Sequence, residues 1–287
     1  MLDTAKLNWP IMFIIEILGH SARIAILVFL MMIVIDFVDV KTRGYFGRLL
    51  KGGLWRQYSI ASFLGVTPGC LGAYMNVTLY IHGFLTFGAV VAGMIATSGD
   101  EAFVMLARFP LQALMLFGIL FVLAIPLGWL SDLAAKKMGI TPQDCELHEI
   151  HKEEKLSGHY LKEHVWKHIV KRHIWRVFLW TFFALLLVNA GMEFWGLEGF
   201  VKEHMGLVLL LAVVVGIIPT SGPHLVFVMM FADGLIPFSV LLANSIAQDG
   251  HGMLPLLSYT VRDSILIKAF NLAAAFLVGG IAYWLGW

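Results

Sequence analysis

Three long stretches of this 287-residue chain contain no Asp, Glu, Lys or Arg. They are residues 57–99, 111–131 and 205–232, with 43, 21 and 28 residues. A helix that crosses the hydrocarbon core of a bilayer needs about 20 apolar residues, so each stretch can supply at least one crossing. With 59% hydrophobic and only 14% charged residues, the chain does not fit the water-soluble globular class. The sequence therefore predicts an all-α polytopic membrane protein.

The chain also matches itself at a fixed offset of 151 residues. Without a gap, residues 65–106 align with residues 216–257, and ten positions are identical. The shared residues include Gly65 with Gly216, Pro68 with Pro219, and Gly99 with Gly250. A constant register and common Pro and Gly positions indicate two copies of one unit. The alternative is a chance match between two apolar stretches.

The charges of equivalent loops indicate how the two copies are oriented. Residues 41–56 carry five basic residues and no acid, which places them in the cytoplasm by the positive-inside rule. The corresponding loop of the second copy, residues 193–204, carries three acids and one lysine, so it is expected on the opposite side. Opposite orientation requires an odd number of crossings per copy, most simply five. We therefore predict about ten transmembrane helices, arranged as two inverted five-helix repeats.

The predicted organisation has three parts. Residues 1–135 form the first membrane repeat and residues 173–287 the inverted second repeat. Residues 136–172 form a His-rich cytoplasmic linker with an amphipathic helix. Histidines four apart in the linker could bind metal from the cytosol, and a solvated linker helix is the simpler interpretation. The first apolar segment, residues 10–38, is expected to be a retained helix in which Glu16, His20 and Arg23 form either a proton relay or a structural ion pair.

Proline and glycine interrupt the apolar segments at corresponding places in the two halves. A helix of about 14 residues rises only about 21 Å, less than the roughly 30 Å hydrocarbon core. Several segments are therefore expected to be discontinuous helices that meet near the middle of the membrane. Broken helices at matching positions of two inverted halves are typical of a transport site. For any single glycine or proline, close helix packing is an equally good explanation.

Polar residues cluster at the same interruptions. Residues 97–101 read TSGDE, and the aligned residues 248–252 read QDGHG. An ionised side chain at the bilayer centre costs roughly 2.5 to 3.5 kcal/mol, so such acids commonly mark an ion or proton path. The other interpretation, that these acids lie at helix ends near the headgroups, stays open. The predicted ligands are Asp100, Asp249, Gln248, Asn244, His224 and Thr97.

This mixed set of oxygen and nitrogen donors suits a fairly hard divalent cation such as manganese. Glu101 and His251 are candidate proton carriers, and Cys70, Ser221, Asn76 and Tyr80 are candidate residues of the cavity wall. His224 could instead be an ordinary hydrogen-bonded helix residue, and Cys70 inert packing. Helix-to-helix hydrogen bonding would explain Asn76 and Tyr80 equally well.

Five short motifs are similar to those of bacterial ten-helix permeases described as manganese or heavy-metal exporters, a family distantly linked to arsenic permeases. They are PGC at 68–70, TSGDEA at 97–102, SGPH at 221–224, ANSIAQDGHG at 243–252 and LPLL at 254–257. The resemblance implies a ten-helix permease of the bacterial inner membrane. One departure is Leu71, where the family motif often continues with glycine, and it weakens a ligand role for Cys70.

Together these features predict a secondary transporter, not an enzyme, that exports a divalent cation by alternating access, in exchange for protons. The expected partners are membrane lipids and the transported metal, with no cofactor and no nucleic acid, and a homodimer is one of the oligomeric states left open. An alternative is a permease for an anionic or neutral solute such as an arsenical or an organic acid, held by half-helix N-termini at Pro68 and Pro219. A third hypothesis is an intramembrane enzyme with Asp249 and His251 as acid and base.

Overall fold

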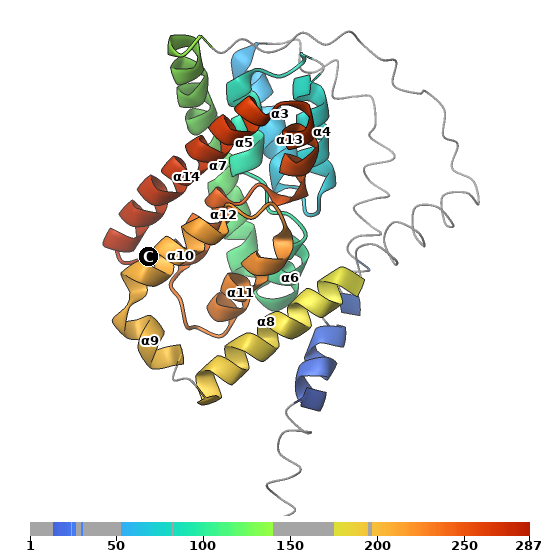
Figure 1. The fold of residues 1–287 in the computed structure, drawn as a ribbon, viewed down its shortest axis with the longest axis vertical. Coiled ribbons are helices and arrows are strands. Elements are labelled where there is room, and N and C mark those ends of the chain that lie inside the picture. Colours follow the sequence, from blue (N-terminus) through green and yellow to red (C-terminus); the bar gives the residue numbers. More distant parts are fainter. Residues whose placement is uncertain are drawn as a thin grey trace, which may run out of the picture.

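The computed structural model describes residues 14–23, 25–26, 30, 53–81, 83–139, 175–194 and 197–287. Within these residues the regular structure is entirely helical (Figure 1). Most of the predicted linker, residues 140–172, lies outside the described residues, as does much of the first apolar segment. The first half contains α3 (Leu54–Val66), α4 (Leu71–Ile81), α5 (Phe87–Ile95), α6 (Glu101–Arg108) and α7 (Pro110–Lys137). The second contains α8 (Trp175–Phe194), α9 (Leu197–Glu203), α10 (Met205–Val215), α11 (Ser221–Ala232), α12 (Phe238–Ala247), η3 (Gly250–Gly252), α13 (Met253–Tyr259) and α14 (Val261–Trp284).

The predicted interruptions of the apolar segments are observed. The helices α3, α4 and α5 have 13, 11 and 9 residues, and α10, α11 and α12 have 11, 12 and 10. At about 1.5 Å per residue, none of these helices reaches across a hydrocarbon core of about 30 Å. Each half instead folds its short helices beside one long helix, α7 or α14, both of which are long and apolar enough to cross a membrane.

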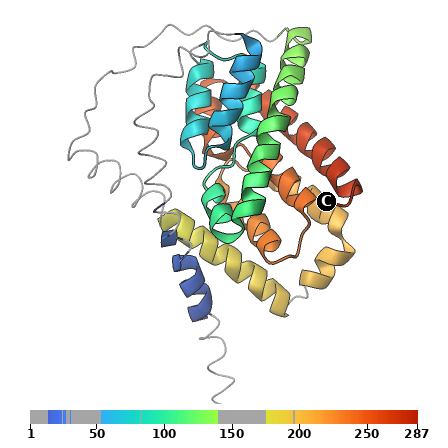
Figure 2. The same cartoon turned by 180° about the vertical axis from the view of Figure 1, so that it is seen from behind.

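The two long helices run in opposite directions (Figures 1 and 2). Near one end of the molecule, Tyr80 donates a hydrogen bond of 2.8 Å to Asp263 in the first turn of α14 and lies near Asp132 in the last turns of α7. Towards the other end, the first half of α7 faces the last turns of α14 across a groove. The chain therefore begins α14 at the level where it ends α7.

Small residues bring the helices of each half into close contact. A Cβ atom on Gly128 of α7 would lie 2.7 Å from the Cβ atom of Ala92 on α5. A Cβ atom on Gly279 of α14 would lie 2.4 Å from the Cβ atom of Ala243 on α12. Both contacts require glycine because the helix axes approach too closely for any side chain. The two pairs are related by the 151-residue offset, so the same packing occurs in both halves.

The polarity of the molecule fits a lipid environment. Outward side chains of the long helices are apolar and exposed, such as Leu111 at 76% and Leu277 at 65% exposure. Polar and acidic side chains are found in the interior, among them Asp100, Glu101 and Asp249. Exposed apolar area on this scale is typical of a surface that contacts lipid tails.

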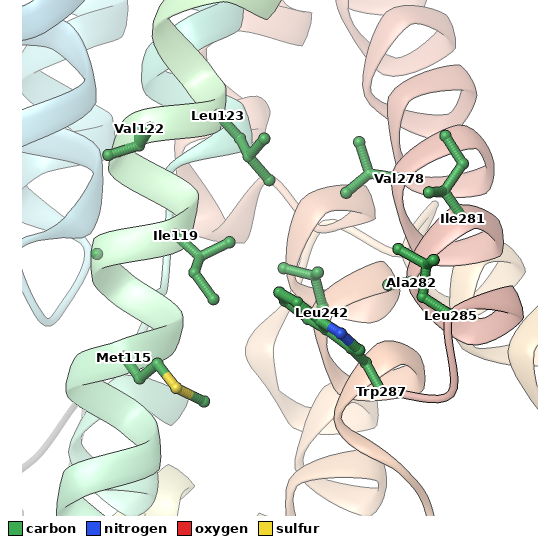
Figure 3. Close-up of a pocket in the computed structure, with 11 residues that line it drawn as sticks. Met115, Ile119, Val122, Leu123, Leu242, Val278, Ile281, Ala282, Leu285 and Trp287 are labelled. Atoms are coloured by element: carbon green, nitrogen blue, oxygen red, sulfur yellow. The ribbon is translucent and has the colours of Figure 1, made fainter.

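An apolar groove of about 730 Å³ lies between α7, α12 and α14 (Figure 3). The residues that line it include Met115 and Ile119 from α7, Leu242 from α12 and Val278 from α14. The heteroatoms of its lining side chains are the indole nitrogen of Trp287 and the thioether sulfur of Met115, and no lining residue carries a charge. The groove therefore lacks the oxygen ligands that a hard divalent cation needs.

Candidate functional site

Four interruptions of the helices meet in the interior. The Gly69 N–H donates to the carbonyl oxygen of Gly99 at 3.0 Å, which joins the α3–α4 and α5–α6 interruptions. The side-chain amide of Gln248, at the α12–η3 interruption, donates to the carbonyl oxygen of Thr97 at 3.1 Å. Ser221 begins α11 beside Gly99, because a Cβ atom on Gly99 would lie 3.0 Å from the Ser221 hydroxyl oxygen. The sequence-predicted polar stretches 97–101 and 248–252 are therefore neighbours.

We call the place where these interruptions meet the junction. Two contacts at the junction join residues that the 151-residue offset relates. Gln248 aligns with Thr97, its hydrogen-bond acceptor. Gly250 aligns with Gly99, and a Cβ atom on Gly250 would lie 3.8 Å from the Cα atom of Gly99. Both glycines have φ of 55°, in the left-handed region that glycine adopts without strain. Contacts between equivalent residues are expected where a local two-fold axis passes between two copies of a unit.

Glu101 places a buried carboxylate at this junction. Its side chain is 1% exposed, and the Ser221 hydroxyl and the Gln248 side chain lie beside the carboxylate as its hydrogen-bonding neighbours. The two carboxylate oxygens, the Ser221 hydroxyl oxygen and the Gln248 amide oxygen thus share one buried region. Among the described residues, the groups that act on Glu101 include no positively charged side chain. A buried carboxylate without a cationic partner is costly, so a ligand with positive charge would stabilise this arrangement.

Asp249 lies in a different environment, although it follows Gln248 in sequence. Its carboxylate is completely buried and forms an ion pair through Oδ2 with the ammonium group of Lys268. Its other oxygen, Oδ1, accepts a hydrogen bond from the side chain of Asn271. Lys268 and Asn271 are three residues apart and lie on the same face of α14. Both oxygens of Asp249 therefore have partners within the protein.

Asp100 and Cys70 form a third polar contact. The Cys70 thiol lies 3.1 Å from Oδ1 of Asp100 and donates to it. Both side chains are buried, with Cys70 in the interruption between α3 and α4 and Asp100 immediately before α6. The thiol thus contacts an acid at the junction.

His224 and Asn244 form a separate pair. The ring nitrogens of His224 lie 3.3 Å from the side-chain oxygen of Asn244 and 3.3 Å from the carbonyl oxygen of Ile218. Asn244 also donates to the carbonyl oxygen of Ala212 on α10 at 2.7 Å. A neutral imidazole has one N–H, so His224 donates to one of these two oxygens. This pair therefore connects α10, α11 and α12.

Asn76 has the same anchoring role in the first half. It donates to the carbonyl oxygen of Ala61 at 2.9 Å, and Ala61 aligns with Ala212 at the 151-residue offset. In one half the asparagine comes from α4, and in the other from α12. The alternative interpretation of Asn76, a hydrogen bond between helices, agrees with this contact. Tyr80 is likewise engaged away from the junction, with Asp263.

The remaining predicted residues are placed as follows. The Thr97 hydroxyl donates to the carbonyl oxygen of Gly93 within its own helix turn, at 2.8 Å. His251 lies in η3, and its side chain is outside the described part of the structure. Glu16, His20 and Arg23 are exposed on the first segment. No group of three or more His, Cys, Asp and Glu side chains in a metal-binding arrangement occurs among the described residues.

Sequence reasoning missed two polar groups that the fold brings together. Lys268 and Asn271 lie beyond the aligned stretch, and the signal for them was a single lysine in the otherwise uncharged residues 264–287. Asp132 was also missed. It accepts hydrogen bonds of 2.7 Å from Tyr58, 2.7 Å from Thr86 and 2.6 Å from the N–H of Gly88, and so holds the N-terminus of α5.

Comparison with known proteins adds one finding. A family model with the description "Putative, 10TM heavy-metal exporter" matches the chain in two overlapping segments, residues 20–188 and 148–286. Together the matched segments cover both halves of the chain. Neither the curated proteins nor the solved structures contain a match.

Proposed function

The chain belongs to the 10TM heavy-metal exporter family, a family of multi-pass membrane transporters, and from this premise we propose that it exports a divalent cation, most simply Mn²⁺, by alternating access. The cation binds at the junction of the four interrupted helices. Membership in a family of exporters also favours transport over the intramembrane enzyme considered from the sequence.

The observation that carries this proposal is a group of four buried oxygens, two of them from a carboxylate that no positively charged side chain of the described residues neutralises. Two belong to Glu101, one to Ser221 and one to Gln248. Carboxylate, hydroxyl and amide oxygens are hard ligands that suit Mn²⁺ better than softer transition metals. A bound cation would satisfy all four oxygens at once. Asp100 and Thr97 border this site, while His224, Asn244 and Asp249 have other partners and are not included among its ligands.

The origin of the ligands favours alternating access. Glu101 comes from the first half, and Ser221 and Gln248 come from the second. Movement of one half against the other would therefore open the site, as in transporters built from inverted repeats. The antiparallel α7 and α14, the repeated Gly–Ala contacts and the contacts between Thr97 and Gln248 support an inverted repeat as the underlying design.

The orientation of the protein follows from its charges. Arg56 lies in the first turn of α3, and Lys136 and Lys137 end α7. The hydrogen bond between Tyr58 and Asp132 brings these two ends together. The positive-inside rule places this basic end, and with it the linker, in the cytoplasm of a bacterial inner membrane. In this scheme Glu101, with His251 as a second candidate, exchanges a proton for the cation during each transport cycle.

The experiment that tests the proposal compares Glu101→Gln with Glu198→Gln. The control removes the same charge from an exposed residue of α9 that pairs with Lys202. At about 100 times its dissociation constant, a ligand stabilises a protein by about 2.7 kcal/mol. We expect Mn²⁺ to raise the melting temperature of purified wild type and Glu198→Gln by several degrees, with no rise for Glu101→Gln. Wild type and Glu198→Gln should also transport Mn²⁺ into proteoliposomes, whereas Glu101→Gln should not.

Two outcomes would overturn the proposal. A full Mn²⁺ response in Glu101→Gln would remove the carboxylate from the site. Stabilisation of wild type by arsenite or an organic anion, without any response to divalent cations, would favour the permease for anionic or neutral solutes. The same assay with Zn²⁺, Fe²⁺ and Co²⁺ ranks the metals.

A further inference from the structure

The second half contains a charged side chain where a free cation would otherwise fit. We propose that the ammonium group of Lys268 is a built-in cation: it occupies a cation subsite formed by Asp249 and the C-terminal ends of α10 and α12, so that the exported metal binds only at Glu101. The location of Lys268 at this subsite stands on the structure alone, and the statement about the exported metal rests on the proposed function.

The contacts of Lys268 are those of a coordinated cation. Its ammonium group pairs with Oδ2 of Asp249 and donates to the carbonyl oxygen of Gly216 at 2.9 Å and to that of Ala247 at 3.4 Å. An ammonium group has three donors, and here each has an acceptor. Asn271 covers the second oxygen of Asp249. The side chain of Lys268 is only 13% exposed.

Both carbonyl groups lie at helix ends that attract positive charge. Ala247 is the last residue of α12, and Gly216 is the residue that caps the C-terminus of α10. The C-terminal end of a helix carries a partial negative charge of about half an electron. Half-helix C-termini combined with a carboxylate form the kind of site that coordinates a coupling cation in transporters with broken helices. Lys268 thus occupies a complete set of cation ligands.

The corresponding positions of the first half carry no acid and no lysine. At the 151-residue offset, Asp249 corresponds to Ser98, Lys268 to Phe117 and Asn271 to Leu120. The carbonyl oxygen of Gly65, which corresponds to Gly216, accepts a hydrogen bond from the backbone N–H of Ser98 at 3.4 Å instead. The acid and the lysine are therefore both present in the second half and both absent from the corresponding positions of the first. This is expected if Asp249 pairs with Lys268 and does not bind the exported metal.

Chemical complementation measures whether the groups around Lys268 can bind a free cation. Truncation of Lys268 to alanine removes three methylene groups and the ammonium group, which together have the size of propylammonium. The truncation leaves Asp249 and the two carbonyl groups around a vacant volume. If these groups form a cation subsite, free propylammonium will bind there.

The experiment measures the melting temperature of purified Lys268→Ala against propylammonium chloride concentration. We expect a low melting temperature without the additive and a saturable rise with it. Wild type should show no rise, because Lys268 already fills the subsite. Propan-1-ol at equal concentrations is the neutral control and should stabilise neither protein. A folded Lys268→Ala protein that does not respond to propylammonium, or a wild type that responds equally, would overturn the proposal.

A second variant, Asp249→Asn combined with Lys268→Met, replaces the charged pair with a neutral pair. It tests the proposal even if Lys268→Ala fails to fold. We expect this variant to fold and its melting temperature to be unaffected by propylammonium. Its melting temperature should still rise with Mn²⁺, as it does for wild type. Loss of the Mn²⁺ rise in this variant alone would make Asp249 a metal ligand and overturn the proposal. Absence of the Mn²⁺ rise in wild type would instead contradict the proposed function, whereas the propylammonium result would still decide the role of Lys268.

Discussion

Two neighbouring glycines of α14 provide a direct test of the helix packing that positions the site. A Cβ atom on Gly279 would lie 2.4 Å from the Cβ atom and 3.2 Å from the Cα atom of Ala243 on α12. A Cβ atom on Gly280 would meet no atom within 4 Å. Alanine in place of glycine inside a helix stabilises by roughly 0.5–1 kcal/mol, and overpacking costs typically about 1–3 kcal/mol. We therefore expect Gly280→Ala to stabilise the protein and Gly279→Ala to destabilise it.

The two variants are compared by thermal unfolding in the same detergent. One kcal/mol corresponds to about 2–4 °C for a protein of 150–250 residues, so the two melting temperatures should differ by several degrees. Gly279→Ala should also weaken the response to Mn²⁺, because the added methyl group pushes α12 outward and Gln248 follows directly after α12. Equal stability of the two variants would refute the close approach of α12 and α14.

The remaining predictions concern the buried carboxylates. Asp249→Asn and Lys268→Met, each alone, should destabilise by about 3–5 kcal/mol because each leaves one uncompensated buried charge, while the double variant should recover most of that loss in denaturant unfolding. A loss in the double variant equal to the sum of the two single losses would contradict a direct ion pair. Tyr58→Phe should cost about 1.5–3 kcal/mol, the usual value of a hydrogen bond to a charged group, because it removes a donor from Asp132. Tyr283→Phe, at a residue that is 39% exposed, is its control and should change the melting temperature little.

The sequence predicts the interruptions of the helices better than it predicts the partners of the polar residues. Glycine and proline act on the local backbone, so their positions indicate where α3, α5, α10 and α12 end. The repeat then indicates that equivalent interruptions meet, and the contact between Thr97 and Gln248 agrees with this expectation. Both inferences need only local rules and a constant register.

The partners of the buried acids depend on distant parts of the chain. Asp132 and Tyr58 are 74 residues apart, and Asp263 and Tyr80 are 183 apart. A list of intramembrane acids does not distinguish Glu101, whose neighbours Ser221 and Gln248 are neutral, from Asp249, which pairs with a lysine. That difference arises from α14, whose Lys268 and Asn271 reach Asp249 and not Glu101. The sequence therefore identifies the buried acids as candidates, whereas the partner of each acid depends on contacts with distant residues.

The asymmetry between the halves follows from what a transport site requires. Two identical copies would place two equivalent acid groups at the junction, and two carboxylates in one buried site repel each other strongly. In this chain Asp249 aligns with Ser98, and Gly252 aligns with Glu101, so neither acid has an acidic counterpart. One acid is paired with Lys268, and the other lies beside the neutral side chains of Ser221 and Gln248. In the proposed exporter, the similar helix ends of the two halves would converge on the site, and the sequence differences between the halves would leave Glu101 as the carboxylate that exchanges its cation.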